Sequence, residues 1–72
     1  MPTWSELKRF CENDGWVLFK KTDHYYFKKR IENNKLLRTK VSFGSKEISP
    51  QLWQLILKKQ LQVSQSYFNS KI

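Results

Sequence analysis

The sequence predicts an α+β fold, a two-layer α-β-β-β-α sandwich in which two helices cover one face of a three-stranded antiparallel sheet. Apolar residues recur with the spacing of a helix near both ends of the chain, and they alternate with a period of two between residues 16 and 43. Capping residues, glycines and a proline separate these stretches. With 72 residues the chain has the length of one domain, and we expect residues 1–72 to form it.

A first helix is expected near residues 3–13. Thr3 and Glu6 have the spacing of a capping box, in which each side chain accepts a hydrogen bond from the backbone amide of the other. Gly15 follows and provides the left-handed residue that commonly ends a helix. The apolar stripe of this helix has four members: Trp4, Leu7, Phe10 and Cys11.

Three strands are expected over residues 16–20, 24–31 and 36–43, because the apolar period changes there from 3.6 to 2. Residues 22–23 form the first turn, and residues 32–35 connect the second strand to the third.

The length of that second connection decides which side chains share a face. A three-residue loop over residues 32–34, with Asn34 left-handed, pairs Tyr25 with Val41 and makes one face apolar. A two-residue loop would instead pair Tyr26 with Val41 and mix apolar and basic residues on both faces. We therefore expect the three-residue loop. The opposite, basic face then carries His24, Tyr26, Lys28, Arg30, Arg38, Lys40 and Ser42.

A second helix is expected to begin at Pro50, with Ser49 as its N-cap. Ser64 can cap a short last turn, from which Tyr67 and Phe68 fold back onto the core. The apolar stripe of the second helix has five members: Leu52, Trp53, Ile56, Leu57 and Leu61.

The charge balance points to an anionic partner. Fourteen Lys and Arg residues against six Asp and Glu residues give a formal net charge of +8, which most often indicates nucleic acid. Cys11 is the one cysteine, so no internal disulfide is possible, and no segment has the pattern of a signal peptide or a membrane span. We therefore expect a soluble cytoplasmic protein with no membrane partner.

Eight of the fourteen cations lie between residues 16 and 43, interleaved with aromatic side chains. This pattern suits RNA, because cations bind phosphates and aromatic rings stack on splayed bases. The simpler alternative is a solvated strand face that keeps the protein soluble. The predicted RNA contacts are Lys20, Lys21, Tyr26, Lys28, Arg30, Arg38 and Lys40.

His24 is the one histidine and lies at the start of the second predicted strand, on the basic face. An imidazole can take a proton from a ribose 2′-hydroxyl and return it to a leaving oxygen, while nearby cations stabilise the charge at phosphorus. The alternative is a surface histidine without a role in chemistry.

Other chemistries lack the residues they need. The six acids are scattered along the chain, one Cys and one His give no metal-ligand spacing, and two glycines do not make a phosphate loop. We expect neither a metal nor a small-molecule cofactor.

Gly15 and Trp16 stand at the start of the first predicted strand, and Phe27 follows His24 by three positions. In these features the segment resembles the HicA family of toxin-antitoxin mRNA interferases. Members of that family typically open the first strand with a glycine–aromatic pair, matched here by Gly15 and Trp16. A Gly-Ser-His segment follows, with an aromatic residue three positions later, and His24 and Phe27 match that pattern. The resemblance covers roughly residues 4–60.

The resemblance implies a fold like that of the double-stranded-RNA-binding domain and an activity against mRNA that depends on His24. It also implies a HicB-like antitoxin that covers the active surface. Thr22 and Asp23 stand where the family has Gly-Ser, so a carboxylate lies beside the histidine in sequence. Two alternatives to the endoribonuclease stay open: a non-catalytic RNA-binding module of the same fold, and a protein that docks an acidic protein partner.

Overall fold

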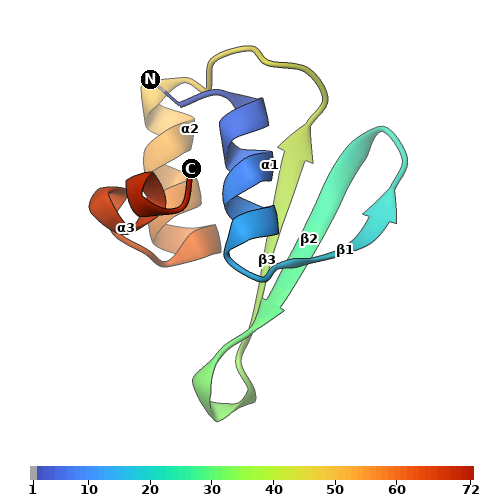
Figure 1. The fold of residues 1–72 in the computed structure, drawn as a ribbon, viewed down its shortest axis with the longest axis vertical. Coiled ribbons are helices and arrows are strands. Elements are labelled where there is room, and N and C mark those ends of the chain that lie inside the picture. The colour runs from blue at the N-terminus through green and yellow to red at the C-terminus, as the bar shows by residue number, and fades with distance from the viewer. Residues whose placement is uncertain (1) are drawn as a thin grey trace.

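The computed structural model describes residues 2–72, and its elements follow the predicted order (Figure 1). Helix α1 spans Trp4–Asn13, and the strands are β1 (Val17–Lys21), β2 (His24–Arg30) and β3 (Leu36–Ser42). Helix α2 spans Pro50–Leu55 and continues as a π-helical stretch, η2, over Ile56–Leu61. A third helix, α3, spans Gln65–Ser70. The predicted α+β class is confirmed, and the short last turn predicted after Ser64 is helix α3, with Ser64 as its N-cap.

The sheet is antiparallel with the order β1-β2-β3, and α1, α2 and η2 lie on one side of it (Figure 1). Tyr25 pairs with Val41, and Asn34 is left-handed with φ 61°. The three-residue loop is therefore confirmed, and it closes with a hydrogen bond from the Ile31 amide to the Lys35 carbonyl. We call the face beneath the helices the covered face and the other the open face.

The first strand begins one residue later than predicted. The Trp16 amide donates to the Cys11 carbonyl and its indole N–H donates to Asp14, so Trp16 closes the helix end and does not enter the sheet. Gly15, with φ 81°, turns the chain there. Strand β1 also contains a bulge between Leu18 and Lys20 that the sequence pattern did not predict.

Both predicted helix starts are confirmed. Thr3 and Glu6 form the complete capping box, and the Ser49 hydroxyl accepts from the Leu52 amide. Leu52 itself was wrongly placed in the buried stripe, since its side chain is 38% exposed. It lies about 100° around the helix from buried Trp53, at the edge of the stripe.

One hydrophobic core joins the helices to the covered face. Phe68 stacks on Phe10 with ring centroids 5.0 Å apart and meets Trp53 edge-on at 4.6 Å, so α3 closes the core against α1 and α2. Cys11 is buried here, and burial together with Asp14 and Glu12 raises the pKa of its thiol to about 12. A thiol in that state is unreactive at neutral pH. The core has thirteen buried members: Leu7, Phe10, Cys11, Trp16, Phe27, Leu37, Val41, Ile48, Trp53, Ile56, Leu57, Leu61 and Phe68.

Among residues 2–72, no helix is both long enough and apolar enough to cross a membrane.

Candidate nucleic-acid interface

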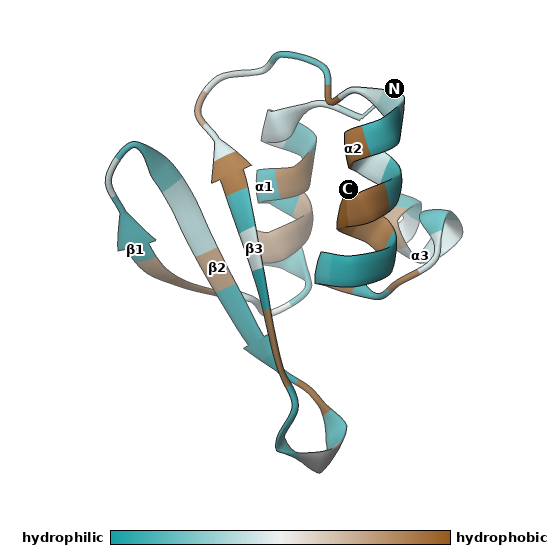
Figure 2. Cartoon of the chain, turned by 180° about the vertical axis from the view of Figure 1, so that it is seen from behind, coloured by the Kyte–Doolittle hydropathy of each residue, from teal (hydrophilic) through white to brown (hydrophobic). Residues whose placement is uncertain are grey.

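The open face takes alternate side chains from β2 and β3. Residues paired across an antiparallel ladder point to the same side, and Phe27 and Val41 are buried on the covered side. Their strand neighbours therefore face away from the helices. The pairs on the open face are His24 with Ser42, Tyr26 with Lys40, Lys28 with Arg38, and Arg30 with Leu36. Hydrophilic residues predominate along β2 (Figure 2).

The bulge in β1 adds two more side chains to this face. The Phe19 ring lies 6.2 Å from the Tyr26 ring, and the Nζ atom of Lys28 lies 5.3 Å from the Phe19 centroid. The Nζ atom of Lys20 lies 5.4 Å from the Tyr26 centroid. Two rings and two ammonium groups thus form one cluster, which we call the aromatic–cation cluster. Its cations contact ring faces and not carboxylates.

A shallow cavity of about 340 Å³ adjoins this cluster. Thr39 and Gln60 both line the cavity, although the side chain of Thr39 lies on the covered side of β3. The Thr39 hydroxyl donates to the side-chain oxygen of Gln60 at 2.6 Å. The cavity is lined by two rings, two cations and two neutral polar residues: Phe19, Tyr26, Arg38, Lys40, Thr39 and Gln60.

His24 lies at one end of the open face, directly after the turn between β1 and β2. Its ring approaches the Tyr26 ring edge-on at 6.3 Å. The Nδ1 atom is buried and has no hydrogen-bond partner among the described residues, and Nε2 lies 3.8 Å from an Asp23 carboxylate oxygen. Nε2 is therefore the nitrogen available to a ligand.

Asp23 is the exposed carboxylate next to His24 in the sequence. The Thr22 hydroxyl donates to it at 2.9 Å and the Tyr26 hydroxyl at 3.4 Å. The hydrogen bond from Thr22, with smaller contributions from His24 and Tyr26, holds the pKa of Asp23 below its ordinary value. Asp23 is thus ionised at neutral pH and adds one negative charge beside the imidazole.

The structure brings together five of the predicted RNA contacts: Lys20, Tyr26, Lys28, Arg38 and Lys40. Arg30 shares their face but lies six residues along β2 from His24, a distance of about 20 Å. Lys21, also predicted to contact RNA, does not lie with them. It pairs with Tyr25 on the covered side, where its Nζ atom lies 5.5 Å from the Tyr25 ring. Neighbouring strand residues point to opposite faces, so Lys20 and Lys21 do not share one.

Phe19 and Gln60 were missed by the sequence analysis. A signal for Phe19 was present, because three consecutive apolar residues, Val17-Leu18-Phe19, do not all reach one core from a strand. No local pattern marks Gln60, which reaches the cavity from η2 and is thus placed by tertiary packing.

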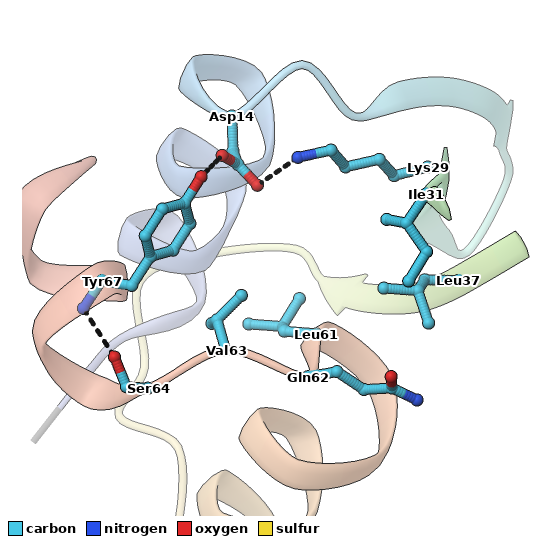
Figure 3. A pocket seen from close by; sticks show the side chains of 9 residues that line it. All are labelled: Asp14, Lys29, Ile31, Leu37, Leu61, Gln62, Val63, Ser64 and Tyr67. Atoms are coloured by element: carbon cyan, nitrogen blue, oxygen red, sulfur yellow. Dashed lines mark hydrogen bonds and ion pairs between the residues drawn. The ribbon is translucent and has the colours of Figure 1, made fainter. Parts of the chain in front are cut away.

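A larger cavity of about 380 Å³ lies on the covered side, near the β2–β3 turn (Figure 3). The polar side chains at its rim bind one another. Asp14 accepts hydrogen bonds from Lys29 at 2.9 Å, from the Trp16 indole at 3.1 Å and from the Tyr67 hydroxyl. These contacts tie α1, β2 and α3 together. The walls are aliphatic, among them Leu37 and Val63. We interpret this cavity as structural.

Within residues 2–72, no three His, Cys, Asp or Glu side chains lie close enough together to hold a metal ion.

Comparison with family models, with curated proteins and with solved structures found no match to this chain.

Proposed function

We propose that this protein is an RNA-binding endoribonuclease of HicA-like type, which holds mRNA on the open face and cleaves it with His24. The observation that carries the proposal is the position of His24 at the end of a face rich in cations and aromatic rings. The net charge of +8 supports the choice of an anionic partner.

The residues nearest His24 suit a phosphate. Lys40 and Lys20 both pair with Tyr26, which lies two residues along β2 from His24, a distance of about 7 Å. Ammonium groups beside a phosphate stabilise the negative charge that develops on the phosphorus centre during attack. Arg38 and Lys28 continue the row of cations along the strand and suit the next phosphates of the chain.

A single imidazole can serve both proton transfers of the reaction. Nε2 of His24 removes the proton from a ribose 2′-hydroxyl, and the 2′ oxygen forms a bond to phosphorus. The bond from phosphorus to the 5′ oxygen of the next nucleotide breaks, and Nε2 returns the proton to that oxygen. The products are a 2′,3′-cyclic phosphate and a 5′-hydroxyl end.

The resemblance to HicA proteins suggests the biological setting. In that setting the protein acts on mRNA in the cytoplasm, and a HicB-like antitoxin inhibits it by covering the open face. An acidic surface on that antitoxin would complement the cations there.

The second candidate is an RNA-binding module without catalysis. The Asp23 carboxylate favours it, because a negative charge 3.8 Å from Nε2 repels the phosphate that the imidazole has to approach.

The third candidate, a basic face that docks an acidic protein and not RNA, predicts no RNA binding at moderate salt.

The test is incubation of a long mRNA with the protein in the presence of a chelator, followed by a denaturing gel. We expect cleavage by the wild type and none by His24→Ala or by His24→Gln, which keeps a polar side chain of similar size. Lys58→Gln, which removes an exposed cation from the helical layer, is the matched control and should cleave normally. Equal cleavage by both His24 variants would refute the assignment of His24. Intact RNA in every lane, with RNA still bound, would leave the non-catalytic module as the function.

A further inference from the structure

We propose that the cavity beside the aromatic–cation cluster seats one unstacked base of single-stranded RNA, and that it selects uracil, which has a carbonyl at position 4 where cytosine has an amino group. This inference rests on the proposed binding of RNA to the open face and names the substrate class of that site.

The walls of the cavity suit a flat ring. Phe19 is 45% exposed although it lies within a strand, and with Tyr26 it presents aromatic surface to solvent. The volume of about 340 Å³ falls at the lower end of the range for small-ligand pockets, about 300–1,000 Å³. Nucleobases stack on such rings irrespective of sequence. A base reaches them only from an unstacked strand, since the bases of an RNA duplex are stacked on their neighbours.

The cations around the walls suit the phosphates on either side of that base. Lys20 and Lys28 lie over the two rings, and Arg38 and Lys40 line the cavity from β3. No acidic residue is among the side chains that line it. A nucleotide is therefore the occupant that matches both the apolar walls and the positive rim.

The rim also has a defined hydrogen-bonding character. The distance of 2.6 Å between Thr39 Oγ1 and Gln60 is typical of an O–H···O bond and short for N–H···O, so the side-chain oxygen of Gln60 accepts from Thr39. The amide nitrogen of Gln60 is then left as a donor. Arg38 and Lys40 supply donors only. Uracil, with carbonyl oxygens at positions 2 and 4 and no exocyclic amino group, matches such a rim, whereas the 4-amino group of cytosine opposes its donors.

Uracil and cytosine provide a matched pair of probes, because both are weakly stacked pyrimidines that differ at the carbonyl or amino group of position 4. Fluorescence anisotropy with labelled 12-nucleotide oligo(U) and oligo(C) would measure both affinities, with His24→Gln as the host to prevent cleavage. We expect oligo(U) to bind about fivefold more tightly. Adding Phe19→Leu, which keeps an apolar side chain but removes the ring, should weaken oligo(U) binding about tenfold.

Gln60→Met is the second variant, and it removes the amide donor while keeping the length of the side chain. We expect it to abolish the preference for oligo(U) over oligo(C) without abolishing binding. A preference for oligo(C), a preference that survives Gln60→Met, or unchanged affinity in Phe19→Leu would each overturn the base pocket while leaving RNA binding intact. Absence of binding to both oligonucleotides would overturn the proposed function itself.

Discussion

The covered and open faces of the sheet come from alternate residues of the same strands, and they differ in how their cations are held. On the covered side, Lys29 donates to the Asp14 carboxylate at 2.9 Å, and the charge is neutralised. On the open side, its neighbour Lys28 lies over the Phe19 ring, and no carboxylate pairs with it among the described residues. The comparison of these two neighbours teaches that the ammonium of Lys29 stabilises the fold, whereas the ammonium of Lys28 stays available to a ligand.

The largest expected effect comes from removing one phenylalanine ring from each face. Phe27 is 2% exposed on the covered face, so Phe27→Ala should lower the free energy of unfolding by about 4 kcal/mol. Phe19→Ala on the open face should cost less than about 1 kcal/mol, because little buried contact is lost. Chemical denaturation measures both values. Equal losses of unfolding free energy in the two variants would show that Phe19 belongs to the core and that the open face is covered by other residues.

A smaller loss of stability is expected from substituting Asp14, the carboxylate beneath the covered face. Burial opposes its ionisation, but hydrogen bonds from Lys29, Tyr67 and Trp16 outweigh burial and lower its pKa below the ordinary value. Removing the charge with Asp14→Asn should cost about 2 kcal/mol, because three donors lose a charged acceptor.

The pH dependence of that stabilisation follows from the sign of the pKa shift. The pKa of Asp14 is lower in the folded state, so its contribution is fully present above the ordinary carboxylate pKa of about 3.9. It is lost as the pH falls through the pKa of the folded state. Thermal unfolding between pH 6 and pH 2 should therefore show a smaller acid-dependent loss in Asp14→Asn than in the wild type. Parallel curves would contradict the role given to these contacts.

The smallest effect is expected from Asp23, the carboxylate at the end of the open face. Asp23→Asn removes a negative charge from the path of the phosphates and should tighten RNA binding about two- to threefold at low salt, less at high salt. Its melting temperature should stay within about 3 °C of the wild type, because the side chain is exposed. Weaker binding in the variant would mean that Asp23 contacts RNA and does not repel it.

Much of the fold follows from local patterns that the sequence displays. The capping box at Thr3, the cap at Ser49 and the left-handed Asn34 depend on residues within a few positions, and all three were predicted. The two faces of β2 and β3 could be assigned because, of the two loop lengths compared, only the three-residue loop separates apolar from basic residues.

The remaining features depend on contacts between distant segments. The β1 bulge shifts the register at Phe19, so Phe19 and Lys20 share the open face although they are neighbours in the chain. Gln60 reaches the cavity only because η2 packs beside β3, a contact that no short motif encodes. The carboxylate of Asp14 joins three elements through partners up to 53 positions away. Local sequence reasoning therefore identified the row of cations but not the cavity beside it.

The most direct test of the open face compares two double variants that remove the same charge. Arg38→Gln with Lys40→Gln removes two cations from the open face, and Lys58→Gln with Lys59→Gln removes two exposed cations from η2. Each leaves a net charge of +6, which is 12 Lys and Arg minus 6 Asp and Glu. RNA affinity is measured as a function of salt in both. The account predicts that the open-face pair loses at least about tenfold in affinity and that its salt slope falls by about two, while the η2 pair changes little. Equal losses of affinity in both double variants would mean that RNA affinity depends on net charge alone. The open face would then not be the binding site.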